Sequence, residues 1–448
     1  MLREFLTYSQ LGRRQRGTRQ QILEYQSARL CKLVEHAYRN VPYYQRLFDK
    51  AGVKPAQIRR SEDLRLVPPT SKADVHATPG QDFIVRGVDP GKLVVRTSGG
   101  STGEPIRIQR TWAEERLLNA FRFRALKTLG LRTTDLRVYI GLLRGNQKAD
   151  HQSVAKAVFK TGLMRFEVVD VLLPVEEVVK RLEQLKPQVI TGYAGAIAHA
   201  AYHINEHGGQ PVIRPRLVVS SAEVLTPRMK SQIAEAFRAP VYNIYGANEV
   251  NIAAWECPKT GEMHTTDDLA IIEVLRDNVP VEPGQRGEVI VTNLHSWAMP
   301  IIRFRLTDVV TRGSDQCSCG LPFGTIRAVQ GRMIDYFPLP DGRLLHPYEF
   351  FDKIIRDRAE WAGQYQFIQE RPDLIRLRVA ASRMPTPQRL EQIRSDAARL
   401  LGDGVEFQFD LVPEIKQEPS GKFRTARSLV RSAYDGIDWQ RVSSGDAQ

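Results

Sequence analysis

Hydrophobic and polar residues follow a helical spacing near the start of the chain. Between residues 19 and 40, four apolar positions are expected on one side of an amphipathic helix: Leu23, Leu30, Val34 and Ala37. Cys31 lies inside this segment. Because free cysteine is among the residue types most often buried, we expect Cys31 to be a core thiol.

The middle of the chain, from about residue 132 to residue 245, alternates between two apolar patterns. Short apolar runs typical of strands occupy residues 166–173, 188–191, 217–220 and 241–245. Helical patterns occupy residues 175–185 and 196–206, and a third helix is expected to begin at Pro227 with Thr226 as its N-cap. This alternation favours a mainly parallel sheet covered by helices, in which ligands bind at the carboxyl ends of strands.

The C-terminal part of the chain follows a different order. Strands are predicted at residues 365–369, 374–380 and 405–412, and a helix at residues 386–401 lies between the last two. The helix would turn four apolar residues inward: Leu390, Ile393, Ala397 and Leu400. We therefore predict an α/β protein. A large N-terminal domain with a mainly parallel sheet would span residues 1–333, and a small mobile α+β lid domain would span residues 334–448.

Composition excludes some classes of function. The chain has 448 residues, with 42% hydrophobic and 26% charged positions, as in an ordinary globular protein. The net charge of +13 suits polyanionic small molecules, nucleic acid or simply a basic surface. Basic residues are spread among acids and no nucleic-acid-binding motif is present, so we expect no nucleic acid partner. No apolar run is long enough to span a membrane and no signal peptide is evident, which favours a cytoplasmic location.

The sharpest motif is rich in glycine and hydroxyl residues. Eight positions, 97–104, hold three glycines and four serines or threonines. Glycine lets backbone N–H groups converge on phosphate oxygens, and hydroxyl groups add donors. Short apolar segments on both sides predict a hairpin. A flexible turn between strands is the alternative interpretation. The expected phosphate contacts come from Thr97, Ser98, Gly99, Gly100, Ser101, Thr102 and Gly103.

This loop resembles the Thr-Ser-Gly-Ser-Thr-Gly-x-Pro motif of adenylate-forming enzymes. The wider chain resembles the phenylacetate–coenzyme A ligase branch of that superfamily, which also includes proteins of capsule-polysaccharide biosynthesis. The resemblance covers nearly the whole chain and begins at residues 37–44 and 66–72. It implies a large N-terminal domain, a mobile C-terminal domain, and ATP, Mg²⁺ and coenzyme A as ligands.

Further motifs follow in the order found in that family. Residues 220–223, Ser-Ser-Ala-Glu, resemble the adenine-contacting segment and assign this role to Ala222 and Glu223. Residues 242–249 resemble the Tyr-Gly-x-Thr-Glu motif, with Asn248 in place of the usual threonine or serine. The resemblance implies that Tyr245 and Gly246 flank the base, that Asn248 lies at the phosphates, and that Glu249 helps to hold Mg²⁺. A carboxylate beside a triphosphate requires a metal ion between them.

Residues 300–308 resemble the motif that ends in the ribose-binding aspartate, here Asp308, with Thr307 where glycine is usual. Arg303 and Arg305 belong to this motif, and a surface cation is the alternative interpretation for either. Residues 331–335 resemble the hinge, with Arg332 near the ribose and Asp335 as the pivot.

Near the C-terminus, residues 418–424 resemble the loop that carries the catalytic lysine of adenylation, here Lys422. A mobile ammonium group there would neutralise the charge that builds up when a carboxylate attacks the α-phosphate. A solvated turn lysine is the alternative interpretation.

The cysteines form a second constellation. Cys257 and His264 flank a turn, and Cys317 and Cys319 form a Cys-Ser-Cys-Gly segment. Three cysteines and one histidine complete a tetrahedral zinc set with no open position, so such a zinc would be structural. The resembled branch contains members with a similar arrangement. Unliganded reduced thiols are the alternative.

These motifs predict an acid–thiol ligase that forms an acyl-adenylate from ATP and a carboxylic acid, possibly an aryl acid, and passes the acyl group to coenzyme A. Two alternatives stay open: transfer to an amine or a carrier-protein thiol, and a noncatalytic nucleotide-binding descendant. The presence of Lys422, Asp308 and Glu249 argues against the latter. Tyr193, Trp255 and Trp297 could line an acid pocket near Tyr245 or could serve packing. The sequence leaves the identity of the acid and the oligomeric state open, including a homodimer.

Overall fold

The computed structural model describes residues 2–97, 106–141, 164–206, 213–332, 337–341, 344–345, 362–381, 384–416 and 426–430. The chain divides into two compact units. Unit 1 comprises Met1–Gly130 and Ile244–Gln330, and unit 2 comprises Leu131–Asn243 and Gly331–Gln448. Each is described by itself below.

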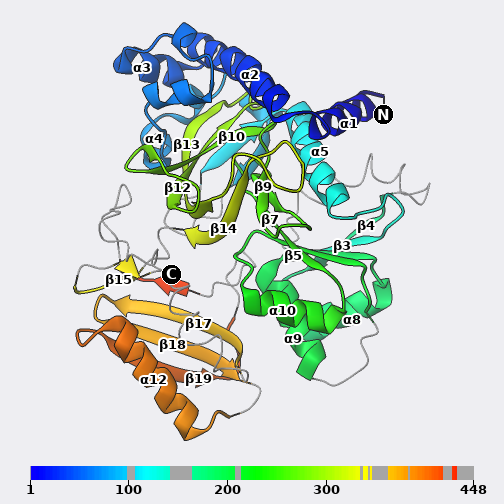
Figure 1. Cartoon of the computed structure of the whole chain (residues 1–448), viewed down its shortest axis with the longest axis vertical. Coiled ribbons are helices and arrows are strands. Elements are labelled where there is room, and N and C mark those ends of the chain that lie inside the picture. Colours follow the sequence, from blue (N-terminus) through cyan, green and yellow to red (C-terminus); the bar gives the residue numbers. More distant parts are fainter. Residues whose placement is uncertain are drawn as a thin grey trace. The chain divides into compact units, whose positions relative to one another are not determined.

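Unit 1 begins with three consecutive helices, α1 (Leu2–Gln15), α2 (Arg19–Asn40) and α3 (Pro42–Ala51), drawn in blue in Figure 1. The predicted bounds of α2 are confirmed, and Thr18 caps the helix through a capping box with Gln21. Its buried face consists of Ile22, Gln26, Leu30, Leu33, Val34 and Ala37.

Two side chains of α2 depart from the prediction. Leu23 is 38% exposed and Cys31 is exposed, so neither is a core residue. Each lies next to a buried position, but the 3.6-residue period turns it away from the buried face. The expectation of a core thiol at Cys31 was therefore wrong.

A helical segment and a hairpin follow in unit 1. Short helical turns and α4 (Lys72–Ala77) lead into the antiparallel hairpin of β1 (Val94–Thr97) and β2 (Arg107–Arg110), as the apolar segments around the glycine-rich loop predict. Thr111 then caps α5 (Trp112–Thr128) through a capping box with Glu114. The hairpin therefore leads directly into the first turn of α5.

The strands of the large sheet in unit 1 run in the order β11-β10-β12-β13-β14-β9-β8, followed by β7, of which only the last two residues belong to unit 1. Their bounds are β7 (Val241–Tyr245), β8 (Ala254–Glu256), β9 (Met263–Thr265), β10 (Ala270–Arg276), β11 (Val279–Pro280), β12 (Arg286–Asn293), β13 (Ile301–Arg312) and β14 (Thr325–Arg332). Antiparallel pairs join β10 to β12 and β12 to β13. This antiparallel part of the sheet was not predicted, because no helical pattern separates its strands.

Strand β13 is bulged twice against β12. Residues 302–303 lie opposite Thr292 alone, and residues 306–308 lie opposite Val289 alone. Each bulge contains a non-glycine residue with positive φ: Arg303 at 47° and Thr307 at 62°. An extra residue bends a strand and redirects the side chains beside it.

The other part of the large sheet lies in unit 2, where the parallel strands run in the order β6-β5-β3-β4. They are β3 (Arg137–Gly141), β4 (Phe166–Asp170), β5 (Val189–Tyr193) and β6 (Leu217–Ser221). Helices α8 (Val175–Leu185), α9 (Ala194–Glu206) and α10 (Pro227–Phe237) pack against them around one apolar core (Figure 1). The predicted βα alternation is confirmed here, including Thr226 as the N-cap of α10.

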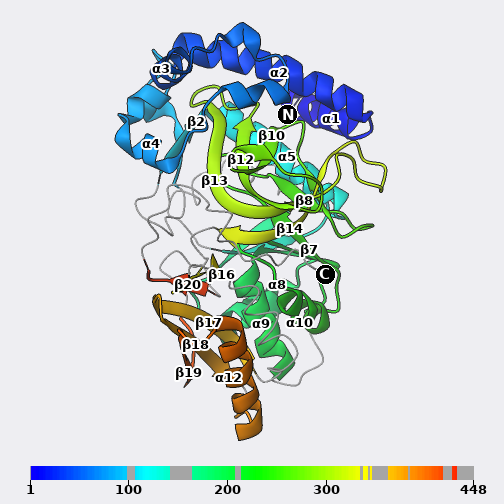
Figure 2. The ribbon, with the colours of Figure 1, turned by 60° about the vertical axis from the view of Figure 1, so that its left-hand side comes forward.

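The C-terminal part of unit 2 has its own sheet, in the order β19-β18-β17-β20. Its strands are β17 (Ala362–Arg371), β18 (Leu374–Ala381), β19 (Glu406–Val412) and β20 (Ala426–Ser428). Helix α12 (Pro387–Leu401) packs its buried Ile393, Ala397 and Leu401 against this sheet (Figure 2). The predicted ββαβ unit is present, and β20 is an additional strand.

The predicted fold class is confirmed: a large mixed α/β sheet with a smaller α+β region at the C-terminus. The predicted domain boundary between residues 333 and 334 stays a prediction. In the part of the chain that the structure describes, no helix has the length and apolar character needed to cross a membrane.

Candidate nucleotide site and metal centre

Two of the predicted nucleotide residues meet directly in unit 1. The hydroxyl of Tyr245, at the end of β7, donates a hydrogen bond to Asp308 Oδ2 at 2.6 Å, across 63 residues of sequence. Both side chains are largely buried, with 8% of each residue exposed. The structure thus joins the two motifs that were predicted to hold the base and the ribose.

Asp308 owes its direction to the second bulge of β13. The preceding residue, Thr307, has φ 62°, in the left-handed region that a β-branched residue rarely adopts. This conformation explains why glycine is usual at the position in the family that the chain resembles. The Thr307 hydroxyl donates to the carbonyl of Leu306 at 2.6 Å.

Gly246 allows the chain after β7 to fold back closely. A Cβ atom on Gly246 would overlap the carbonyl oxygen of Asn251. The turn that follows contains Asn248 and the buried Glu249. Asn293 Nδ2 donates to the Glu249 carbonyl at 2.8 Å, and Arg110 donates to the Asn248 carbonyl. The Asn248–Glu249 turn is therefore held through its main chain from two sides.

The predicted phosphate loop is only partly visible. Thr97 is the last residue of β1 and lies opposite Arg107 in the hairpin. Ser98, Gly99, Gly100, Ser101, Thr102 and Gly103 lie outside the described residues. The hairpin that carries the loop is held to α5, because Arg96 Nη2 donates to Glu115 Oε1 at 2.6 Å.

Other predicted residues fall in unit 2. Ala222 follows β6 with φ 69°. Glu223 Oε2 accepts the backbone N–H of Gly195 at 2.6 Å, in the first turn of α9, where a carboxylate suits the positive end of the helix. The main chain of Arg332 ends β14. Asp335 and Lys422 lie outside the described residues.

Arg303 and Arg305 have separate partners. Arg303 is 2% exposed and binds Glu273 through Nε at 3.0 Å and Nη2 at 2.9 Å. Its Nη1 donates to the Val67 carbonyl at 2.7 Å. Arg305 pairs with Glu288. The surface-cation interpretation is therefore wrong for Arg303, which forms a buried ion pair.

The cysteine and histidine cluster assembles in unit 1. Ligand atoms of Cys257, His264, Cys317 and Cys319 all lie within 4.8 Å of one another. The Sγ atoms of Cys317 and Cys257 are 3.9 Å apart, and Cys319 Sγ is 3.5 Å from His264 Nε2. Zn–S bonds of about 2.3 Å and Zn–N bonds of about 2.0 Å in a tetrahedron place such atoms roughly 3.8 and 3.5 Å apart. The four residues therefore fit a zinc ion.

Turns shape this cluster. Gly261 and Gly320 have φ of 76° and 97°, and their N–H groups bond back to the carbonyls of Cys257 and Cys317. Backbone N–H groups of Cys319 and Leu321 also donate to cysteine sulfur, each at 3.5 Å. Such donors stabilise thiolates.

The titration of the cluster is shaped by burial and by these donors. Burial lowers the pKa of His264 to about 4, which keeps its imidazole neutral as a metal ligand requires. Burial opposes ionisation of Cys257, but hydrogen bonds from Thr260 and from the Lys259 N–H outweigh it, so the pKa of Cys257 is lowered. Burial raises the pKa of Cys319 to about 11. A bound cation would reverse this last effect.

Known proteins are similar to this chain both over most of its length and in its C-terminal part. The model of the CapK C-terminal domain matches residues 340–428. Phenylacetate–coenzyme A ligase of Thermus thermophilus is 25% identical over 449 residues, covering 92% of this chain and 97% of the relative. The Escherichia coli enzyme of that name is 29% identical, but the match covers 63% of this chain and 65% of the relative.

These similarities support the phenylacetate–coenzyme A ligase and CapK branch that the sequence motifs resemble.

A solved structure shares the fold of this chain. The 2-hydroxyisobutyryl–coenzyme A ligase, in its postadenylation state with R3-HIB-AMP, superposes with a TM-score of 0.77 at 22% identity, covering 93% of this chain and 91% of the other. Because these relatives are acid–coenzyme A ligases, they support the prediction that this chain is an AMP-forming acid–coenzyme A ligase.

Trp255, Trp297 and His295 pack within unit 1. Trp255 is fully buried, 5.3 Å in ring-centroid distance from both His264 and Phe323, so it lies in the core beside the cysteine and histidine cluster. Trp297 packs edge-on against His36. His295 bonds to the Asp268 carbonyl at 3.1 Å, and burial lowers its pKa to about 3.

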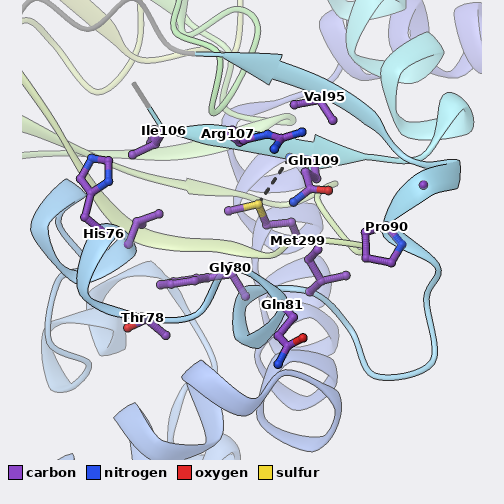
Figure 3. A pocket seen from close by; sticks show the side chains of 14 residues that line it. His76, Thr78, Gly80, Gln81, Pro90, Val95, Ile106, Arg107, Gln109 and Met299 are labelled. Carbon is purple, nitrogen blue, oxygen red and sulfur yellow. Dashed lines mark hydrogen bonds between the residues drawn. The ribbon is translucent and has the colours of Figure 1, made fainter. Parts of the chain in front are cut away.

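A cavity of about 520 Å³ lies beside the β1–β2 hairpin (Figure 3). Its walls include Val95, Ile106 and Arg107 of the hairpin segment, with His76 and Met299 opposite. None of the predicted nucleotide residues lines it. Sequence patterns gave no signal for this cavity, because its lining comes from separate short segments.

Proposed function

We propose that this protein activates a carboxylic acid with ATP and transfers the acyl group to coenzyme A. In the first step a carboxylate oxygen attacks the α-phosphate, forming an acyl-adenylate and releasing pyrophosphate. In the second, a thiol attacks the acyl carbon, forming a thioester and releasing AMP and a proton. The observation that carries the proposal is the hydrogen bond between Tyr245 and Asp308, which joins two nucleotide motifs distant in sequence.

Each proposed role follows from the chemistry of its residue. Asp308 would accept ribose hydroxyls, as carboxylates do in other nucleotide sites. Glu249 would bind Mg²⁺, which neutralises charge on the triphosphate when bound. Lys422 would offset the charge that develops during attack on the α-phosphate. Residues 334–448 would act as a lid that pivots near Asp335.

The relatives reduce the range of candidate substrates. Phenylacetate–coenzyme A ligases are similar to this chain, in one case over 92% of its length, so an aryl or medium-sized organic acid is our proposed substrate. Because ATP, coenzyme A and reduced thiols coexist in the cytoplasm, we also propose a cytoplasmic location.

Acid-dependent ATP–pyrophosphate exchange tests the adenylation step. A panel of aryl and aliphatic acids should include one that supports exchange, and Lys422→Ala should reduce exchange at least hundredfold. Lys416→Ala, an exposed lysine of the same C-terminal part, is the matched control. Near-normal exchange in Lys422→Ala would remove this lysine from adenylation.

The acyl acceptor is tested separately. Reactions with an exchange-active acid should yield an acyl–coenzyme A thioester only when coenzyme A is added. Exchange without thioester would indicate an amine or a carrier-protein thiol as the acceptor. A purified chain with no measurable ATP affinity would contradict the proposal as a whole.

We also propose that the cluster of Cys257, His264, Cys317 and Cys319 holds a structural zinc ion. Metal analysis should find close to one zinc per chain, and Cys317→Ser should lose it and lower the melting temperature. Cys31→Ser, at an exposed cysteine outside the cluster, is the control. Full stability of a zinc-free protein would refute the structural role.

A further inference from the structure

A buried arginine lies at the base of the hairpin of β1 and β2. Arg110 is the last residue of β2, pairs in register with Val94, and is only 3% exposed. A buried guanidinium group is costly unless its charge is paired and its N–H groups are used. The partners of Arg110 therefore indicate why the fold retains it.

These partners lie in two different motifs. Arg110 Nη2 donates to the carbonyl oxygen of Asn248, in the turn that leads to Glu249. Arg110 Nη1 lies 3.6 Å from Glu115 Oε2, in the first turn of α5. This carboxylate also accepts from Arg96 on β1, through Oε1 at 2.6 and 3.1 Å. Guanidinium groups from both strands of the hairpin thus share one buried carboxylate.

The electrostatics extend this link to Glu249. Burial lowers the pKa of Arg110, and Glu115 is the main opposing charge. Arg96 adds to the lowering, whereas Glu114 and Glu249 oppose it. The charge on Glu249 therefore attracts Arg110, so an electrostatic interaction as well as a hydrogen bond holds the turn to the hairpin.

We propose that Arg110 is a positioning residue that holds the Asn248–Glu249 turn against the hairpin bearing the phosphate loop. This role rests on the proposed function, because it requires the loop and the Glu249 carboxylate to meet the same Mg²⁺-bound triphosphate. Arg110 binds the backbone oxygen of Asn248, so it fixes the main chain of the turn and would not contact the nucleotide itself.

The test compares ligands with and without the outer phosphates. Arg110→Lys keeps the charge but loses the planar fork that can reach two partners at once. Equilibrium dialysis should show about tenfold weaker binding of Mg–ATP, and a higher Mg²⁺ requirement, with AMP affinity within about twofold of wild type. ATP–pyrophosphate exchange should fall by a similar factor, while thioester formation from preformed acyl-adenylate should change less than twofold.

Controls separate positioning from a purely structural role. Arg116→Lys replaces an exposed arginine on α5 and should leave both affinities unchanged. Glu115→Gln should weaken Mg–ATP binding in the same direction, and combining it with Arg110→Lys should add little, because both act through one network. Thermal unfolding measures the folded fraction of each variant.

Two results would overturn the inference: an unchanged Mg–ATP affinity in Arg110→Lys, or equal losses of Mg–ATP and AMP affinity. A wild-type protein that binds no ATP would overturn the proposed function and this role with it. Wild-type binding with an unaffected Arg110→Lys variant would overturn the role of Arg110 alone.

Discussion

Strand β13 has two bulges. Each contains a non-glycine residue with positive φ, but the two bulges have different roles. At the first, Arg303 has φ 47° and its side chain forms a buried ion pair with Glu273. At the second, Thr307 has φ 62° and the next residue, Asp308, reaches Tyr245. The first bulge secures the core of unit 1, and the second sets a side chain of the candidate nucleotide site.

Positive φ at a non-glycine residue therefore accompanies two different roles in this strand. Both non-glycine residues occupy a conformation that costs of order 1–3 kcal/mol. Strain alone therefore does not identify the site, because it accompanies a structural ion pair as well. The hydrogen-bond partners distinguish the two roles. Arg303 binds a carboxylate and a carbonyl within the protein. Asp308 binds Tyr245 through one oxygen and belongs to a motif expected to bind ribose.

The largest effect is expected at the first bulge. Glu273→Gln leaves the buried Arg303 without its counter-charge and should lower the free energy of unfolding by about 3 kcal/mol. Folded molecules of this variant should keep near-normal ATP–pyrophosphate exchange. Chemical denaturation and exchange assays check the two expectations, with the exposed Glu282→Gln as control. A stable variant without exchange would reverse the roles assigned to the bulges.

The second bulge should give the opposite result. Asp308→Asn keeps the shape of the side chain but loses the charge that strengthens hydrogen bonds to ribose hydroxyls. We expect kcat/KM for ATP to fall about hundredfold, or about 2.7 kcal/mol, with little change in melting temperature. Asp315→Asn, in the exposed segment after β13, should match wild type. If Asp308→Asn unfolds the protein instead, the Tyr245–Asp308 pair is primarily structural.

Relief of strain at Thr307 should have a smaller effect. Thr307→Gly removes the Cβ that the left-handed conformation disfavours, and should raise the free energy of unfolding by about 1 kcal/mol. Asp277→Gly, at an exposed turn residue with φ 52°, is the control, because aspartate tolerates this region better. Destabilisation by Thr307→Gly would indicate that the threonine side chain itself holds the bulge.

The smallest effect concerns pH, because two influences oppose each other at Glu288. Burial raises the pKa of Glu288 from 4.5, Arg305 lowers it, and Asp308 across the second bulge adds to the rise. A carboxyl with a raised pKa binds protons more tightly in the folded state. Its stabilising contribution is present below pH 4.5 and is lost as the pH rises through the folded pKa.

Across that window, the free energy of unfolding should fall more with rising pH in wild type than in Glu288→Gln. Urea denaturation at a series of pH values measures the difference. Identical slopes would mean that Arg305 fully offsets the burial of Glu288.

Local patterns predicted the segments from β4 to α10 in unit 2 well, because β4, β5 and β6 are short apolar runs and each is followed by one periodic helix. The bounds of α8 and β7 are those expected. The antiparallel strands of unit 1 were missed, since no periodic helix lies between them to mark each strand as part of a βα unit. Cys31 was misplaced because residue type was given more weight than its position on the helical face.

Sequence motifs identified Tyr245 and Asp308 for the candidate nucleotide site and four residues for the cysteine and histidine cluster. The fold brings the members of each group together. No motif pointed to Arg110 or to the ion pair of Arg303. Their importance comes from partners far along the chain, which no local pattern records.

The sequence alone determined the order of the elements and the chemistry of the side chains, because helical period, strand length and capping residues act over a few neighbours. The tertiary structure determines which of these side chains come into contact. Bulges in β13 turn Asp308 toward Tyr245, and the hairpin brings Arg110 to Asn248. Those contacts depend on register and burial across the fold, which are set only when distant segments exclude water together.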